Sequence, residues 1–170
     1  MTHYVMYKPH TDLDGYLVSW FIHLQRTGDL YSTFFPVMHT FSGFLAGFQH
    51  SELVLAVEND TVWAATWVEK QNDAPFIGVW IDEPYRGSFR AAKFLTTWHS
   101  NIKAAYPTTL CLTQQPGVVA LAEHLGYTNH GSIPALWAGE PAYLLSSTKE
   151  FAYGQRQRRR SHFPEPSTSH

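Results

Sequence analysis

The sequence contains little cysteine, little charge and no long apolar run. Cys111 is the single cysteine among 170 residues, so the chain cannot form an intramolecular disulfide, and this composition suits a reducing compartment. No stretch approaches the roughly 20 apolar residues of a membrane helix, and the first residues lack the basic leader and apolar core of a secretory signal. We therefore expect a cytoplasmic protein with no membrane contact.

A metal-binding pattern is also missing. The ten histidines lack the close spacing of ligand pairs, and one cysteine cannot complete a zinc site. We expect no metal. Cys111 has no adjacent base motif, so we expect it to pack in the interior and not to act as a nucleophile.

Charge is distributed unevenly along the chain. Residues 1–150 contain eight basic and thirteen acidic residues, whereas 151–170 contain four arginines and one acid. With 44% apolar and 15% aromatic residues overall, the first part is expected to form one packed domain. The second part is expected to be a flexible basic tail. Its arginines, Arg156 to Arg160, either make a weak, salt-dependent contact with nucleic acid or only solubilise the chain.

The apolar periodicity predicts a mixed α/β domain. A helix begins near Thr11 and Asp12, buries a stripe from Leu13 to Leu24 and ends at Gly28. The aromatic segment 30–49 either lies under the sheet or lines a pocket. The remaining elements are strands 3–7, 52–57, 62–69, 76–81, 108–113, 132–137 and 142–147, and helices 88–106 and 117–124. A strand–helix–strand unit among hairpins predicts a mostly antiparallel sheet of six to seven strands with about four helices.

The turn after strand 76–81 has the features of a phosphate site. It contains Arg86 and Gly87 and leads directly into helix 88–106, for which we expect a buried stripe of Phe89, Ala92, Leu95, Trp98 and Ile102. Unpaired amides at a helix start attract anions, and arginines bind phosphate.

The segment Arg86-Gly87-Ser88-Phe89-Arg90-Ala91 resembles the pyrophosphate loop of the GNAT superfamily of N-acyltransferases. The family pattern is Arg or Gln, two variable residues, Gly, one variable residue, then Gly or Ala. Phe89 stands where the family prefers glycine. Its side chain could point inward and leave its amide free, or it could block the loop. Some phage-encoded members have a similar Arg-Gly-Ser-x-x-Ala loop, which suggests a phage origin and location in the host cytoplasm or the virion.

A second resemblance lies further along the chain. The segment Leu121-Ala122-Glu123-His124-Leu125-Gly126-Tyr127 is similar to the glycine-closed fourth helix of the family, with Gln115 near the place of a family asparagine. Ala122 stands where much of the family has the tyrosine that protonates the thiolate of CoA. The usual general acid is therefore absent from this sequence.

The resemblance covers about residues 4–147 and implies a function. It implies an acyl-CoA-dependent N-acyltransferase that uses acetyl-CoA or another acyl-CoA as co-substrate and transfers the acyl group to an amine of a small molecule or protein. A backbone amide near Val79 or Trp80 would polarise the thioester carbonyl. The implied cofactor-binding residues are Val79, Trp80, Ile81, Arg86, Gly87, Ser88, Phe89, Arg90, Ala91 and Gln115.

Catalytic side chains are less well defined by the sequence. Glu69 or Asp82 could accept the amine proton, directly or through water, and Tyr127 or Tyr143 could replace the missing acid. Each also has an ordinary interpretation, as a turn acid or a packed ring. Because Phe89 and Ala122 both depart from the family pattern, the alternative is a catalytically inactive binding or structural module with the same fold, for example in a virion.

Overall fold

The structure is a computed structural model that describes residues 2–9, 11–69, 75–137 and 139–148. The expected basic tail at 151–170, including the nucleic-acid contact proposed for Arg156 to Arg160, lies outside these residues. No helix among the described residues is long and apolar enough to cross a bilayer.

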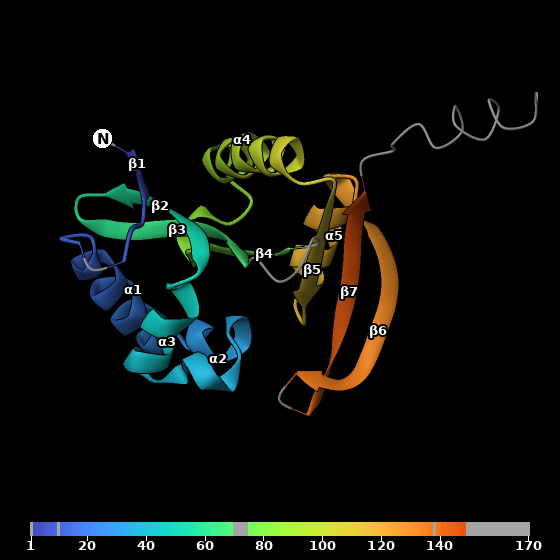
Figure 1. Cartoon of the computed structure of the whole chain (residues 1–170), viewed down its shortest axis with the longest axis horizontal. Coiled ribbons are helices and arrows are strands. Elements are labelled where there is room, and N and C mark those ends of the chain that lie inside the picture. Colours follow the sequence, from blue (N-terminus) through green and yellow to red (C-terminus); the bar gives the residue numbers. More distant parts are fainter. Residues whose placement is uncertain (1, 10, 70–74, 138, 149–170) are drawn as a thin grey trace, which may run out of the picture.

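The described strands form one seven-stranded sheet in the order β1-β2-β3-β4-β5-β7-β6 (Figure 1). Every neighbouring pair is antiparallel except β4 and β5, which are parallel. The expected mixed, mostly antiparallel sheet is therefore confirmed, although the last hairpin begins four residues earlier than expected. The strands are β1 His3–Met6, β2 Ser51–Glu58, β3 Thr61–Glu69, β4 Phe76–Ile81, β5 Thr108–Thr113, β6 Thr128–Trp137 and β7 Glu140–Thr148.

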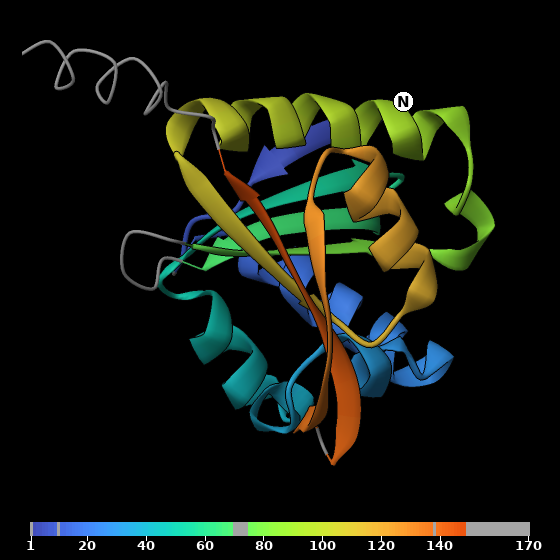
Figure 2. The ribbon, with the colours of Figure 1, turned by 90° about the vertical axis from the view of Figure 1, so that its right-hand side faces the viewer.

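Helices cover both faces of the sheet. The α-helices are α1 Asp14–Thr27, α2 Asp29–Thr33, α3 Phe41–Phe48, α4 Phe89–Ala105 and α5 Pro116–His124, and the short 3-10 helices are η1 Pro36–His39 and η2 Glu83–Tyr85. Helices α1 to α3 pack on one face of β2 and β3, and α4 packs on the other. Helix α5 lies against β5 and β7, as Figure 2 shows in its rotated view.

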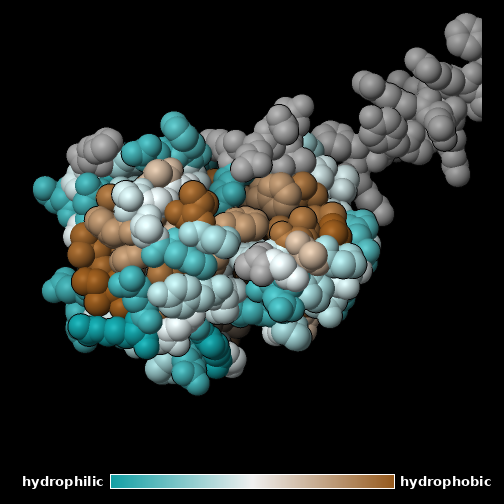
Figure 3. Space-filling model, turned by 90° about the horizontal axis from the view of Figure 1, so that it is seen from below, coloured by the Kyte–Doolittle hydropathy of each residue, from teal (hydrophilic) through white to brown (hydrophobic). Residues whose placement is uncertain are grey.

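The aromatic segment 30–49 supplies much of the largest core cluster. Trp20 of α1 lies at the centre of this cluster, with its ring 5.2 to 6.4 Å from five other rings. Those rings belong to Phe34, Phe44, Phe48, Trp67 and Trp80. The expected buried stripe of α1 is confirmed at Leu17, Trp20, Phe21 and Leu24. Apolar residues still reach the surface on both halves of the molecule (Figure 3).

The buried stripe expected for α4 was wrong at its first residues. Phe89 and Ala92 are exposed, while Ala91 and Phe94 are buried in their place. Leu95 and Ile102 are buried as expected. Both stripes fit a helical period, and the inward face is set by how the helix docks on the sheet, which the period alone does not specify.

The sheet opens between its two parallel strands. β4 pairs with β5 only through Phe76 with Leu110 and Ile77 with Cys111, and the strands then diverge (Figure 1). The amide of Asp82 donates to the Trp63 carbonyl on the β3 side. Because strand amides alternate in direction, the amide of Trp80 also faces β3, whereas those of Val79 and Ile81 face the gap.

Candidate active site

The turn after β4 presents free backbone donors. Gly87 adopts a φ of 73°, a conformation that favours glycine, and Ser88 caps α4 by accepting a hydrogen bond from the Ala91 amide at 3.2 Å. The amides of Gly87, Phe89 and Arg90 have no hydrogen-bond acceptor among the described residues. These donors lie at the positive end of a helix of 17 residues, which makes the turn suitable for an anion.

Phe89 neither packs inward nor blocks this turn, because its side chain is 85% exposed. The side chain of Arg90 is directed away from the turn. Its guanidinium forms an ion pair with Glu58 at 2.9 Å and lies over the ring of Trp63, 4.5 Å from the ring centroid. The backbone amide of Arg90 therefore remains available to a ligand, whereas its guanidinium does not.

Arg86 is held at the edge of the β4–β5 gap by two contacts. Its Nη2 donates to the Asp29 carboxylate at 2.6 Å, and its Nε donates to the Ile81 carbonyl at 2.9 Å. Asp29 also accepts a hydrogen bond from the Trp80 indole at 2.8 Å. These contacts orient the guanidinium, and its side chain remains nearly half exposed. The Trp80 indole itself packs into the core against Trp20.

A cavity of about 370 Å³ lies between β4, the start of α4 and α5. All the expected cofactor-binding residues line it except Phe89 and Arg90. We call this space the cofactor cavity.

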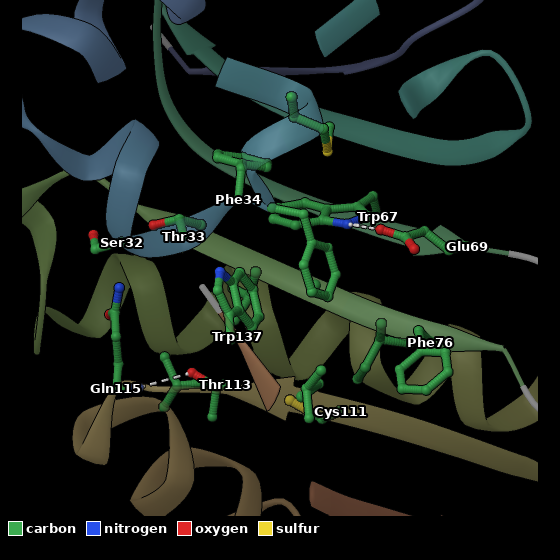
Figure 4. Close-up of a pocket in the computed structure, with 17 residues that line it drawn as sticks. Ser32, Thr33, Phe34, Trp67, Glu69, Phe76, Cys111, Thr113, Gln115 and Trp137 are labelled. Carbon is green, nitrogen blue, oxygen red and sulfur yellow. Dashed lines mark hydrogen bonds between the residues drawn. The ribbon is translucent and has the colours of Figure 1, made fainter. Parts of the chain in front are cut away.

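A second cavity, of about 300 Å³, lies on the opposite side of β4, towards α2 and η1. Its walls are mainly apolar and include Phe34, Phe35, Trp67, Phe76 and Trp137 (Figure 4). We call this space the acceptor cavity.

The two cavities meet at one place. Thr33, Val79, Gln115 and Val118 line both of them, and we call this set the junction. The amide of Val79 points into the gap here, so the junction contains a free backbone donor. In Figure 4, Thr33 and Gln115 lie towards one end of the acceptor cavity, and Glu69 and Phe76 lie towards the other.

A pair of stacked rings forms part of the wall of the acceptor cavity. Phe35, just after α2, stacks on Trp137 at the end of β6, with centroids 4.2 Å apart and an interplanar angle of 15°. The stack joins the N-terminal helical segment to the C-terminal hairpin. The aromatic segment 30–49 therefore has both of its expected roles, since Phe44 and Phe48 are core residues while Phe34 and Phe35 also line a cavity.

Glu69 lines the acceptor cavity at the end of β3. Its carboxylate accepts a hydrogen bond from the Trp67 indole at 3.1 Å, and burial nevertheless raises the pKa of Glu69 above its ordinary value. The backbone of Glu69 lies opposite Phe76 in the register, but its carboxylate reaches back to the Trp67 indole, which covers Gly78. The carboxylate therefore lies on the part of the cavity wall next to Val79, and Glu69 stays a candidate base for an amine at the junction, directly or through water.

The other expected catalytic residues lie away from both cavities. Asp82 is buried, bonds to His23 Nε2 at 2.9 Å and accepts a hydrogen bond from the amide of Glu83. Tyr127 is buried against Thr109, with hydroxyl oxygens 2.8 Å apart, and burial raises the pKa of Tyr127 to about 12. Tyr143 packs at the edge of the cluster around Leu145. Of the expected catalytic residues, the structure brings only Glu69 to a wall of the acceptor cavity.

Two polar side chains of the site escaped the sequence analysis. The Thr33 hydroxyl and the Trp137 indole nitrogen are buried without a hydrogen-bond partner among the described residues, and both residues line the acceptor cavity. Thr33 also belongs to the junction. A threonine near the end of a short helix and a tryptophan in a hairpin belong to no local motif, so only their position in the fold marks them.

Comparison with known proteins relates this architecture to acetyltransferases. The sequence matches no family model and no curated protein at a significant level. Solved structures do match. An N-acetyltransferase from Staphylococcus aureus Mu50 has a TM-score of 0.65 and 15% identity, covering 88% of this chain and 99% of its own. The spermidine N-acetyltransferase of Vibrio cholerae has a TM-score of 0.65 and 10% identity, covering 91% and 99%.

A third similar structure contains the ligand that the loop resemblance implies. It is a ribosomal alpha-N-protein acetyltransferase in complex with coenzyme A, with a TM-score of 0.63 and 11% identity, covering 85% of this chain and 93% of its own. The chain therefore has the fold of the GNAT acetyltransferases, as the sequence predicted.

Proposed function

We propose that the protein is an acyl-CoA-dependent N-acyltransferase, with acetyl-CoA as the favoured co-substrate. One observation carries the proposal: free amides and Arg86 border a cavity that meets a second cavity at the junction. Such an arrangement holds a phosphorylated carrier on one side of β4 and an acceptor on the other.

The residues present fit the parts of CoA. The amides of Gly87, Phe89 and Arg90, together with the Arg86 guanidinium, are donors suited to a pyrophosphate. Beyond Ile77, the edge of β4 has no strand partner, and its Ile81 amide also faces the gap. This amide is suited to an extended amide-containing chain such as pantetheine, as it would be to a neighbouring strand. Phe89 is compatible with this fit, because its side chain points to solvent and its amide is free.

The junction positions the groups that acyl transfer needs. Acetyl-CoA supplies a thioester, whose carbonyl carbon would form a bond with the acceptor nitrogen while its bond to sulfur breaks and CoA leaves. The Val79 amide stabilises the negative charge that develops on the carbonyl oxygen, and the Thr33 hydroxyl donates a hydrogen bond to the leaving sulfur. The nitrogen loses one proton, to Glu69 directly or through water, and the sulfur gains one.

The departure at Ala122 is less damaging than the sequence suggested. Ala122 lies in the apolar cluster between α5 and the sheet and lines neither cavity. The group that assists the leaving sulfur must therefore come from another position. Thr33 is the unpartnered hydroxyl at the junction. A groove filled by Phe89 or Trp80 would favour the inactive module, and neither side chain fills the cofactor cavity. The active enzyme is therefore the better supported of the two functions.

Acetyl-CoA binding is the direct test of this proposal. We expect isothermal titration of the full chain to give a Kd of about 1 to 100 μM, in the range of ordinary enzyme substrates. Acetyl-CoA should also raise the unfolding temperature. The absence of both heat and a thermal shift at about 1 mM ligand, well above that range, would contradict the proposed function.

Replacing Thr33 by valine should lower kcat about tenfold to a hundredfold, because the variant keeps the shape of the side chain but loses the donor to the leaving sulfur. Release of free CoA thiol, followed with a chromogenic disulfide, measures the effect. The matched control is Thr97→Val on the exposed face of α4, which should be indistinguishable from the wild type. Equal rates for Thr33→Val and Thr97→Val would remove Thr33 from the reaction.

A further inference from the structure

The charge of the acceptor cavity comes from one carboxylate. Glu69 is the one charged residue among the described residues that line the cavity, and no lysine, arginine or histidine is among them. The hydroxyl and amide side chains of the same wall are uncharged, namely Ser32, Thr33, Thr113 and Gln115. An acidic group of an acceptor would therefore meet no cationic side chain in this part of the chain and would be repelled by Glu69. The cavity favours a cationic acceptor over an acidic one.

This carboxylate lies on the part of the wall where the reaction is proposed. It accepts a hydrogen bond from the Trp67 indole at 3.1 Å, and the indole covers Gly78, the neighbour of Val79. The amide of Val79 points into the gap at the junction. One ammonium group is therefore enough for both features, because the carboxylate attracts it and can accept the proton that the nitrogen must lose before it attacks.

Much of the remaining wall is aromatic. Five rings line the cavity, those of Phe34, Phe35, Trp67, Phe76 and Trp137, and Figure 4 shows four of them labelled around it. They come from the segment after α2 and from β3, β4 and β6. Aromatic walls favour an aromatic ligand, because rings bury a large area and pack edge-to-face or in offset stacks. A hydrophilic chain would lose its hydration against the same walls without gaining hydrogen bonds.

We propose that the acceptor is a small arylalkylamine, whose single ammonium group lies beside Glu69 at the junction and whose ring packs against Phe76 and the Phe35–Trp137 stack. This inference rests on the proposed function, since it names the acceptor of the same site. The cavity volume of about 300 Å³ is at the lower limit for small-molecule sites, which suits one ring on a short carbon chain. The proposal disfavours amino acids, because of their carboxylate, and polyamines, because each further ammonium group would need its own acid.

A set of amines tests the ring and the charge separately. With acetyl-CoA as co-substrate, we expect kcat/KM for phenethylamine to exceed that for butylamine by about tenfold to a hundredfold, the effect of burying a ring. Phenylalaninol should exceed phenylalanine, which has a carboxylate in place of its hydroxymethyl group, by about tenfold or more. Putrescine should be poorer than butylamine. Equal values for phenethylamine and butylamine, or a preference for phenylalanine or putrescine, would overturn the proposal.

The variant Phe35→Leu tests the aromatic wall. It keeps an apolar side chain but removes the ring, so the ratio of kcat/KM for phenethylamine over butylamine should fall about threefold to tenfold, the range of an aromatic pair. The matched control is Tyr31→Leu on α2, because Tyr31 is exposed and lines neither cavity. The control should keep the wild-type ratio. If the ratio is unchanged in both variants, the ring of the acceptor does not pack against this wall.

Binding without co-substrate separates this inference from the proposed function. Calorimetry in the absence of acetyl-CoA should show that the wild type binds phenethylamine at least about tenfold more tightly than phenylpropionate, which has the same ring on a similar chain but an acidic end. The variant Glu69→Gln, which removes the charge and keeps the shape, should bind the two with similar affinity. The control Glu123→Gln on the exposed face of α5 should keep the preference.

The two proposals can then fail independently. Equal affinities of the wild type for phenethylamine and phenylpropionate would refute the arylalkylamine even if acetyl-CoA binds. A preference that survives Glu69→Gln would show that Glu69 does not recognise the amine. Failure of acetyl-CoA to bind would refute the acyltransferase without changing the result for the amines.

Discussion

Replacing Val79 by proline should lower kcat about 10²- to 10³-fold, the effect of removing one donor to a developing oxyanion. Proline has no amide hydrogen, and the Val79 amide points into the gap between β4 and β5, where it has no partner in the sheet. Proline is tolerated in strands at such unpaired positions. The substitution should therefore remove the catalytic donor without breaking the β3–β4 ladder.

The control for this variant is Val79→Ala, which shortens the side chain but keeps the amide. We expect Val79→Ala to retain kcat within about threefold of the wild type, while Val79→Pro loses most of it. Circular dichroism and acetyl-CoA titration establish that each variant is folded and binds co-substrate. If folded Val79→Pro that binds acetyl-CoA keeps the wild-type kcat, the Val79 amide does not act on the carbonyl.

Replacing Arg86 by alanine should weaken acetyl-CoA binding about 10- to 100-fold, the effect of losing charge-assisted hydrogen bonds. Arg86 lines the cofactor cavity beside Gly87 and Ser88. In the wild type, Arg86 forms an ion pair with Asp29 at 2.6 Å. The substitution therefore also leaves the Asp29 carboxylate without its countercharge, and its negative charge would repel the phosphates of a bound CoA. Arg86→Lys should give an intermediate affinity, because lysine keeps the charge but lacks the planar guanidinium.

The matched control removes a charge of the same sign from the same helix region. Lys93 is exposed on α4 and lines neither cavity, so Lys93→Ala should leave the Kd for acetyl-CoA within about twofold at moderate ionic strength. Isothermal titration of both variants gives the comparison. Similar losses in Arg86→Ala and Lys93→Ala would show a general effect of charge and would argue against a phosphate contact by Arg86.

Local features of the chain were predictable because short segments determine them. Gly28 and Gly126 were expected to end helices, and both adopt the left-handed conformation there. Arg86 and Gly87 were expected at a strand-to-helix turn, and the structure places them between β4 and α4. Strand β4 itself has the predicted bounds, since an apolar run between turn residues is a local pattern.

Features that depend on docking were less predictable. The α4 stripe was assigned to the wrong face at Phe89 and Ala92, because the helical period allows neighbouring faces and only packing selects one. Thr33, Glu69 and Trp137 lie 36 or more residues apart in the sequence, and the sheet and its covering helices bring them to one cavity. Glu69 and Asp82 were equal candidates for the base, and only the fold distinguishes them, because Glu69 lines the acceptor cavity and Asp82 lines neither cavity.

The sequence by itself determined the order of most elements, the mixed sheet and the place of Arg86 and Gly87 in a strand-to-helix turn. These follow from apolar periodicity, turn residues and a motif of six neighbouring residues. Only the tertiary structure decided the direction of the Phe89 side chain, the opening of the sheet after Ile77 and the meeting of two cavities at Val79. The physical reason is that such a site is defined by strand register and by packing between distant segments, neither of which a local pattern specifies.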